Sequence, residues 1–299
     1  MLISVIICTH DRAARLERCL RALVPRPGSA DDWEVIVVAN ACSDNTVARV
    51  AAFQPSFGAK LRTIEEPKPG LSLARNVGAA AARGRFLVYL DDDAVPAAGW
   101  LEGYRDHFRR HPDSKGGGGP IEPDWGDLKR PSYWRPEFEV NRASLRFAPP
   151  TEVFPDDCLP FGANMFMRAD SFHELGGFDP QLGMRGKRLG LGEETDWFLR
   201  LKRTGAPIGY APDALVQHWV NPRDISRSGL RRRAFEAGVV SVQVFQAARP
   251  ARGWLGWCRH TLSAAVQGRL HMGEQVYLLM ELGRLWATSN SRDDHRPRA

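Results

Sequence analysis

Cysteine is scarce in this chain, and no two cysteines are spaced like metal ligands. The 299 residues include five, which are scattered: Cys8, Cys19, Cys42, Cys158 and Cys258. The lack of a CxxC pair argues against a zinc site, and the scatter argues against a disulfide framework. The composition therefore favours a protein of a reducing compartment, which we take to be the cytoplasm.

Long hydrophobic runs and a leader pattern are missing as well. No apolar stretch approaches the roughly 20 residues that a membrane-spanning helix needs. The chain runs from Met1 directly into the apolar stretch 3–7, without the basic and small-residue features of a signal peptide. We therefore expect no spanning segment, and any contact with a membrane would be peripheral, at its inner face.

Positive charge, in contrast, is concentrated in one part of the chain. The net charge is +6, and residues 223–269 hold nine arginines against two acids. Such a block attracts phosphorylated substrates or anionic lipid, or it is a solvated helix face. It lacks an aromatic platform or a recognised module, so we expect no nucleic-acid partner. Trp254 and Trp257 in this block could seat the protein on a membrane, pack on the rest of the chain, or form a homodimer contact.

The most informative stretch is an apolar run that ends in three carboxylates. Residues 86–90 predict a strand buried on both faces, because aromatic and branched residues follow one another without polar alternation. Asp91, Asp92 and Asp93 come next and would repel one another without positive charge nearby. Carboxylate oxygens are ligands that Mg²⁺ and Mn²⁺ prefer. The stretch therefore predicts a divalent cation site, and a solvated turn is the alternative.

Strand and helix patterns alternate along the first hundred residues. Strands are expected at 2–9, 33–39, 60–65 and 86–90, with helices at 12–24, 44–53 and 72–82. Alternating β and α units predict an α/β fold with a doubly wound, mostly parallel sheet. Ligands of such sheets bind beyond the carboxyl ends of the strands. Thr9, Asn40 and Asp91 should therefore converge on one cleft.

The remainder of the chain divides into three expected parts. Residues 116–160, with four consecutive glycines and several prolines, are expected to be irregular, and strands at 161–167 and 214–218 and a helix at 193–204 follow. We expect a catalytic domain over 1–225, with a nucleotide-binding half at 1–115 and an acceptor-binding half at 116–225. A helical region would cover 226–290, and a disordered tail 291–299.

The order and spacing of the motifs resemble family 2 glycosyltransferases of the GT-A fold, over roughly residues 3–235. The segments that carry the resemblance are SVIICTHDR at 4–12, EVIVVAN at 34–40, GLSLARNVG at 70–78, the acidic triplet, GAN at 162–164, GGFD at 176–179 and GEETD at 192–196. The resemblance implies an inverting transfer of a sugar from a UDP-, dTDP- or GDP-sugar. The acceptor would be a hydroxyl of a saccharide or of a lipid-linked molecule.

The resemblance implies a donor site at the first strand ends. Thr9 and Arg12 would contact the nucleotide, although Thr9 can also be an ordinary strand-end hydroxyl. Asn40 would hydrogen-bond the base. Ala39 stands where the family commonly has Asp, which leaves the selectivity for the base open.

Further donor contacts are implied by basic residues later in the chain. Arg75 would either lie against the donor or pair with Asp91 or Asp92. Arg185 and Lys187, in a Gly-rich loop at 183–192, could close over the pyrophosphate, or the loop is a solvated basic segment.

The resemblance divides the metal-binding roles among the acids. Asp93 would bind the divalent cation, Mn²⁺ or Mg²⁺, that bridges the diphosphate, and Asp91 would lie near the ribose and the cation. Asp92 could take either role. His218 ends a strand and would join the metal site, as in some members of the family, or serve a structural role.

The catalytic base is implied within the GEETD motif. Glu194 occupies the base position, and Glu193 and Asp196 are the other candidates, although acids also favour a helix N-terminus for its dipole alone. A degenerate transferase that binds without turnover is one alternative. A sugar nucleotidyltransferase is another, but such enzymes begin with a Gly-rich, Lys-containing loop where this chain has THDR at 9–12.

Overall fold

The computed structural model describes residues 2–25, 32–135, 138, 145–147, 151–184, 192–243, 278–280 and 282–284. The chain forms two compact units, the first from residues 1–124 and 143–219 and the second from 125–142 and 220–299. Segment 125–142 thus groups with the C-terminal part of the chain. Arg185, Lys187, the tryptophans at 254 and 257 and the tail at 291–299 lie outside the described residues.

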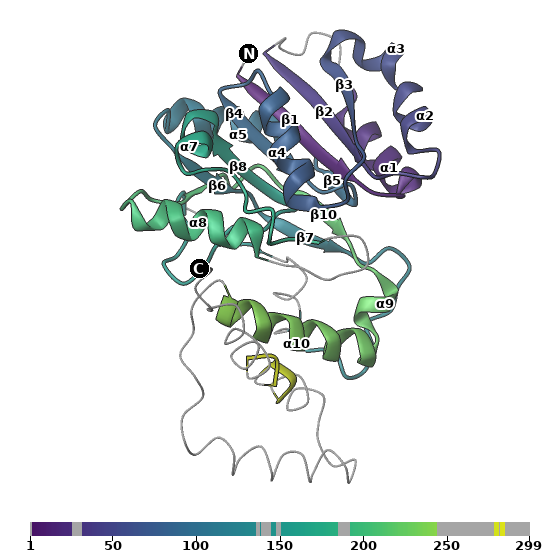
Figure 1. Cartoon of the computed structure of the whole chain (residues 1–299), viewed down its shortest axis with the longest axis vertical. Helices are drawn as coiled ribbons and strands as arrows, with labels where there is room; N and C mark the ends of the chain where they lie inside the picture. Colours follow the sequence, from purple (N-terminus) through teal and green to yellow (C-terminus); the bar gives the residue numbers. More distant parts are fainter. Residues whose placement is uncertain are drawn as a thin grey trace, which may run out of the picture. The chain divides into compact units, whose positions relative to one another are not determined.

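A seven-stranded sheet is the centre of the first unit (Figure 1), with the strand order β3-β2-β1-β4-β8-β6-β9. Its strands are β1 (Ile3–Thr9), β2 (Trp33–Asn40), β3 (Leu61–Glu66), β4 (Phe86–Leu90), β6 (Gly116–Gly118), β8 (Asn164–Arg168) and β9 (Gly209–Tyr210). Strands β1 to β4 are parallel, and β8 runs antiparallel between β4 and β6. The predicted α/β fold with a mostly parallel sheet is confirmed.

Helices cover both faces of this sheet. They are α1 (Ala13–Leu23), α2 (Thr46–Ala51), α3 (Gln54–Phe57), α4 (Leu71–Ala81), α5 (Trp100–Arg110), α7 (Ala169–Glu174) and α8 (Glu193–Arg203), with a 3₁₀ turn at Gly58–Lys60. Ile36 and Val38 of β2 pack with Ala74 of α4, whereas their neighbours along the strand face the main core with α1. Because both faces are covered, the strands read as continuous apolar runs.

The glycine run at 116–119 is not irregular as predicted, because it contains strand β6. A Cβ atom on Gly117 would lie 1.9 Å from the carbonyl oxygen of Gly209, and one on Gly116 would lie 2.8 Å from the Trp197 ring. Glycine is therefore required by the close approach of neighbouring backbone and rings, and not by a turn. Composition alone could not separate these two uses of glycine.

A small second sheet in the same unit brings a distant segment beside the acidic triplet. It contains β5 (Ala94–Pro96), β10 (Val216–Trp219) and β7 (Ile121–Asp124), in the order β5-β10-β7. His218 pairs with Ala94, and the Trp219 amide donates a hydrogen bond of 3.0 Å to the carbonyl oxygen of Asp93. The backbone pairing thus places His218 next to the triplet.

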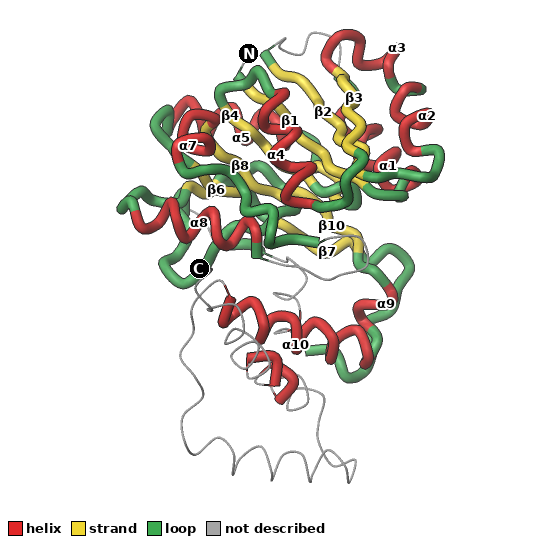
Figure 2. The backbone as a smooth tube through the Cα atoms, viewed as in Figure 1, coloured by secondary structure: helices red, strands yellow, loops and turns green. Residues whose placement is uncertain are grey.

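The second unit contains α9 (Pro222–Ile225) and α10 (Arg227–Gln243), and its described residues 125–135 form turns and loop (Figure 2). Phe138 and Leu230 form a small apolar cluster there, and the Tyr133 hydroxyl donates to the Ile225 carbonyl at 2.9 Å. None of the helices in the described part of the chain is long and apolar enough to cross a membrane.

Candidate active site

The acidic triplet follows β4 directly, at the edge of the sheet where β1 also ends. Its three side chains have different surroundings: Asp92 is 3% exposed, Asp93 13% and Asp91 34%. The backbone therefore turns one carboxylate into the protein and leaves the other two toward solvent. The difference in burial separates Asp92 from Asp91 and Asp93, a distinction that the sequence alone did not make.

Asp92 is a buried acceptor for two residues that were predicted to contact the nucleotide. The Thr9 hydroxyl donates to it at 2.7 Å, and Nη1 of Arg12 donates at 3.0 Å. Burial raises the pKa of Asp92 to about 6, against the opposing charge of Arg12. In this structure Asp92 therefore ties the end of β1 and the start of α1 to the end of β4.

Asp93 is surrounded by positive or proton-donating groups. Nε2 of His218 lies 3.1 Å from Asp93, and guanidinium nitrogens of Arg12 and Arg15 lie at 3.4 Å and 3.8 Å. Burial by itself would raise the pKa of Asp93, but His218 and the two arginines outweigh it and hold the pKa below its usual value. Asp93 is therefore an ionised, partly exposed carboxylate.

Asp91, Asp93 and His218 form a cluster suited to a divalent cation. One ligand atom from each of them lies within 4.8 Å of the others. Two carboxylates and an imidazole are a donor set that Mn²⁺ accepts. Arginines already offset much of the negative charge of the triplet. The argument for a metal therefore rests on the types of ligand atom, and not on repulsion among the three carboxylates.

Arg75 joins the triplet to helix α8. Its buried guanidinium donates to Glu193 at 2.6 Å and to Asp91 at 3.2 Å. A Cβ atom on Gly162 would lie 2.3 Å from Nη2 of Arg75, so only glycine leaves room for the guanidinium. Of the two partners considered for Arg75 within the triplet, the structure selects Asp91 and adds Glu193.

The three acids at the start of α8 differ in what holds them. Glu193 is 3% exposed and paired with Arg75, and burial raises its pKa against the opposing charge of Arg75. Asp196 accepts a hydrogen bond of 2.9 Å from Nε of Arg200, one turn later, and forms an ion pair of 2.8 Å with Nη2 of the same residue. Glu194 is partly exposed and makes no hydrogen bond or ion pair with the described residues. Of these three acids, Glu194 is therefore the one that no described residue engages through a hydrogen bond or ion pair.

The sequence of the chain matches a known protein family. Residues 4–176, more than half of the chain, match the sequence profile of Glycosyl transferase family 2. The chain belongs to this family. It is 26% identical over 227 residues to the glucosyl-dolichyl phosphate glucuronosyltransferase of Haloferax volcanii, covering 73% of this chain and 69% of that protein. Its identity to the succinoglycan biosynthesis protein ExoM of Rhizobium meliloti is 26% over 243 residues, covering 79% and 72%.

Solved structures show the same fold. The mannosyltransferase PcManGT from Pyrobaculum calidifontis, in complex with GDP-Man and Mn²⁺, superposes with a TM-score of 0.61 at 17% identity, covering 98% of this chain and 76% of that one. GalNAc-T7 with UDP, GalNAc and Mn²⁺ gives a TM-score of 0.56 at 18% identity, covering 80% and 48%. The chain is a family 2 glycosyltransferase with the GT-A fold.

In this glycosyltransferase, Asn40 holds a loop together. Its Oδ1 accepts from the Gly70 amide at 2.8 Å, and its Nδ2 donates to the carbonyls of Lys68, at 2.7 Å, and Glu66, at 3.2 Å. The amide has only one lone pair left for a ligand. The contact of Asn40 with a nucleotide base stays a prediction. The structure shows that Asn40 holds the loop before α4 through three hydrogen bonds.

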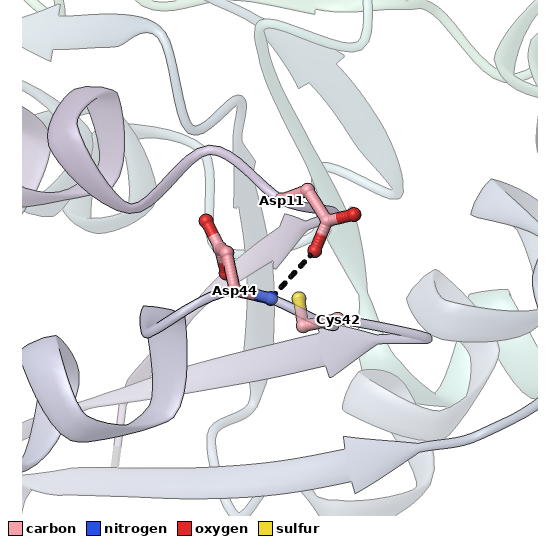
Figure 3. A group of neighbouring side chains, drawn as sticks. All are labelled: Asp11, Cys42 and Asp44. Atoms are coloured by element: carbon pink, nitrogen blue, oxygen red, sulfur yellow. Dashed lines mark hydrogen bonds between the residues drawn. The ribbon is translucent and has the colours of Figure 1, made fainter.

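A second cluster of possible ligands lies at the ends of β1 and β2 (Figure 3). It comprises Asp11, Cys42 and Asp44. The Asp11 carboxylate accepts from the backbone amides of Ser43, at 2.6 Å, and Asp44, at 3.1 Å. Asp44 in turn accepts from the Thr46 amide at 3.0 Å. These acids therefore join the loops that follow the two strands. The candidate metal site remains the cluster of Asp91, Asp93 and His218.

Arg15 is a site residue that the sequence did not reveal by motif. It lies one helical turn after Arg12, faces Asp93, and has its guanidinium 3.8 Å from the centre of the Trp219 ring. The signal available was the i, i+3 spacing of Arg12 and Arg15, which puts both on one helix face. Arg185 and Lys187 stay predictions, since they fall within the undescribed part of their loop.

Proposed function

We propose that this enzyme transfers a sugar from a nucleotide-diphosphate sugar to an acceptor hydroxyl with inversion at the anomeric carbon. One observation carries the proposal: the guanidinium of Arg75 bonds both Asp91 of the metal cluster and Glu193 of α8. Glu194 follows Glu193 at the start of α8, and its charge acts on Arg75 together with the charges of Glu193 and Asp91. A leaving-group site and a base are thus joined by one buried residue.

The donor site is built from Asp91, Asp93 and His218. These residues would hold Mn²⁺ or Mg²⁺, and the bound cation would neutralise the charge that develops on the departing diphosphate. Arg12 and Arg15 flank Asp93 and add positive charge for the same diphosphate. The complexes of PcManGT with GDP-Man and Mn²⁺ and of GalNAc-T7 with UDP and Mn²⁺ support this reading. The nucleotide would be UDP, dTDP or GDP.

Glu194 is the base in this proposal. It takes the proton of the acceptor hydroxyl while that oxygen bonds to the anomeric carbon and the bond from this carbon to the diphosphate breaks. Glu193 is engaged by Arg75 and Asp196 by Arg200, so neither is available for the proton without giving up an ion pair. A positioned base of this kind contributes about 10²–10⁴-fold to the rate.

The acceptor is a saccharide or a lipid-linked saccharide. The relatives named for glucosyl-dolichyl phosphate and for succinoglycan biosynthesis support these two classes. A lipid-linked acceptor would be met by peripheral contact of the basic C-terminal part of the chain with the membrane. A homodimer through the same part stays a prediction.

The proposal is tested by thermal unfolding with UDP, dTDP and GDP, each with and without Mn²⁺. A nucleotide that binds should stabilise the protein by about 2.7 kcal/mol at 100 times its dissociation constant. Asp93→Ala should lose the Mn²⁺-dependent part of this effect. Asp106→Ala, an exposed acid on α5, is the matched control and should keep it. Stabilisation by none of the nucleotides, with or without Mn²⁺, would overturn the proposed donor site.

A protein that binds the donor without turnover is the competing function, because Ala39 and the Glu-Glu pair depart from the family pattern. Hydrolysis or transfer of a nucleotide sugar, measured with Mn²⁺, separates the two. Binding without either reaction, for every donor and acceptor, would favour the binding protein.

A further inference from the structure

Residues 178–184 form an irregular segment that is buried near both ends and exposed in the middle. The segment contains no helix or strand. Phe178 is 1% exposed and Gly183 is buried, whereas residues 179–181 are exposed. The two ends therefore pack against the protein while the part between them faces solvent. Residues 178–184 are called the cover segment below.

Each buried end of the cover segment lies against one partner of the ion pair between Arg75 and Glu193. The guanidinium carbon of Arg75 is 5.8 Å from the centre of the Phe178 ring. A Cβ atom on Gly183 would lie 3.2 Å from Oε2 of Glu193, so this glycine packs closely on the carboxylate. The two charged side chains are each 4% exposed, and the cover segment supplies part of that burial.

Helix α4 supplies the hydrogen bonds that hold the cover segment. The Asn76 side chain donates to the carbonyl oxygen of Phe178 at 2.8 Å and accepts from the Phe178 amide at 3.0 Å. One helical turn earlier, the Ser72 hydroxyl donates to the carbonyl oxygen of Leu182 at 2.7 Å. An irregular segment has no ladder of its own, so its backbone groups need such partners. Residues four apart share a helix face, and Asn76 and Ser72 therefore hold the two ends from one side.

The ion pair that the cover segment shields connects two parts of the active site. Arg75 also donates to Asp91 of the acidic triplet at 3.2 Å, and Glu193 is the first residue of α8. Attraction between a guanidinium and a carboxylate weakens when water raises the local dielectric constant. A wet and loosened pair would let the start of α8 move relative to the triplet. Asn76 and Ser72 are engaged with the cover segment, so their effect on the triplet passes through the ion pair.

We propose that Asn76 and Ser72 are positioning residues of the sugar transfer, which hold the cover segment against the Arg75–Glu193 ion pair and so keep this pair dry and fixed. Neither residue needs to contact the donor or the acceptor, because each acts through the position of α8 beside the triplet. Their effect on transfer rests on the proposed function, whereas their effect on the ion pair does not.

The ion pair is followed directly by the side-chain N–H protons of Arg75, in the full chain labelled with nitrogen-15 arginine. Their exchange with heavy water is measured by NMR, and their resonances are identified by their loss in Arg75→Lys. Asn76→Ala should speed this exchange by about tenfold or more, because the released cover segment admits water. Ser72→Ala should act in the same direction but less strongly, since the Leu71 amide still donates to the carbonyl oxygen of Met184 at 2.9 Å.

A second buried arginine, Arg105, is an internal control for loss of stability as such. Its side chain is 6% exposed and pairs with Asp32 at 2.6 Å. General destabilisation would speed exchange at both arginines, whereas the proposed role speeds it at Arg75 alone. Gln54→Ala is the matched control variant, because it also removes a side-chain hydrogen bond to a backbone carbonyl, that of Gly58. It should leave both exchange rates unchanged.

Sugar transfer with Mn²⁺ provides the second measurement, as kcat for the folded protein. Asn76→Ala should lower kcat by about tenfold or more, because small displacements of reacting groups are costly in rate. Gln54→Ala should not change it. If Asn76→Ala does not fold, Ser72→Ala decides, and if Arg75→Lys does not fold, the resonances are identified by their shift in Glu193→Gln.

The two measurements separate this inference from the proposed function. Unchanged exchange at Arg75 in Asn76→Ala, equal acceleration at Arg105, or an unchanged kcat would each overturn the positioning role. If the unaltered protein transfers no sugar, the proposed function fails, and the exchange rates alone decide whether the cover segment keeps the ion pair dry.

Discussion

Arg75 shows how a single buried side chain can fix the positions of two acids that are far apart in the sequence. Its guanidinium is 4% exposed and lies between a carboxylate at the end of β4 and another at the start of α8. Arginine suits this place because its planar fork can bond two acids in fixed directions. The cost of burying the ion pair is met only while both partners are present. The ion pairs of Arg75 therefore serve to position Asp91 and Glu193 more than to stabilise the fold.

Removing the guanidinium of Arg75 should show that the buried charge of Glu193 is tolerated only while its partner is present. Arg75→Met leaves Glu193 buried without its partner and should lower the free energy of unfolding by about 3–5 kcal/mol, measured by urea denaturation. The double variant Arg75→Met with Glu193→Gln removes both charges and should be more stable than Arg75→Met alone. A loss below about 1 kcal/mol for Arg75→Met would contradict the role given to the pair.

His107 predicts a pH dependence with a definite sign. Burial, with the nearby charges of His111 and Arg110, lowers the pKa of His107 from 6.5 to about 4. Since the folded-state pKa lies below the unfolded value, the unfolded chain takes up the proton first as the pH falls. The contribution to stability is therefore fully present above pH 6.5 and is lost as the pH falls toward 4.

The size of this effect can be measured against His107→Phe, which does not titrate. Between pH 7 and pH 5 the unaltered protein should lose about 2 kcal/mol more of its unfolding free energy than the variant does. Urea denaturation at the two pH values provides the comparison. Equal losses in the two proteins would show that the imidazole titrates normally in the folded state.

At the scale of elements, β6 shows where packing requires glycine. Gly117→Ala would put a methyl group 1.9 Å from the backbone oxygen of Gly209, which cannot move without breaking the sheet. We expect a loss of at least about 3 kcal/mol, or a protein that does not fold. Gly58→Ala is the control, because a Cβ there meets nothing within 4 Å and only the positive φ of 57° is strained. It should cost about 1–2 kcal/mol, and equal losses would contradict the packing argument.

The same scale explains which parts of the fold the sequence predicted. The run 86–90 lacks polar alternation, and the strand observed there has the same bounds and is buried throughout. The glycines at 116–118 carry no side-chain pattern at all, so their strand could not be predicted. The pairing of β10 with β5 joins residues more than 100 positions apart, and only the structure brings His218 to Asp93.

For the site, the sequence predicted residue types better than partners. Asp91, Asp93 and His218 were named as ligands, and the structure brings them together in one cluster. Thr9 and Arg12 were expected at the nucleotide, but both bond Asp92. A motif places a residue in a site, whereas the atom that it contacts depends on rotamers and neighbours that no motif specifies.

At the scale of the whole molecule, positive charge is not evenly distributed. Of the nine arginines at 223–269, Arg232 and Arg233 share Asp224, with nitrogen–oxygen distances of 3.0 Å and 2.6 Å. Two acids cannot offset the other arginines of this segment. The surplus should attract anionic surfaces and weaken with salt.

We therefore expect the protein to sediment with vesicles that contain anionic phospholipid at low salt. It should stay in solution with vesicles of phosphatidylcholine alone, and binding to the anionic vesicles should fall as salt is raised. Absence of binding to anionic vesicles at low salt would remove the membrane contact from the account.

The central claim, that Glu194 is the base of a sugar transfer, is tested most directly by Glu194→Gln in a transfer assay with its donor and Mn²⁺. The account predicts that nucleotide binding, followed by thermal stabilisation, is kept while transfer falls by about 10²–10⁴-fold. Asp196→Asn, which alters an acid two residues away that Arg200 engages, should reduce transfer far less. Transfer by Glu194→Gln at a rate close to that of the unaltered enzyme would contradict the claim.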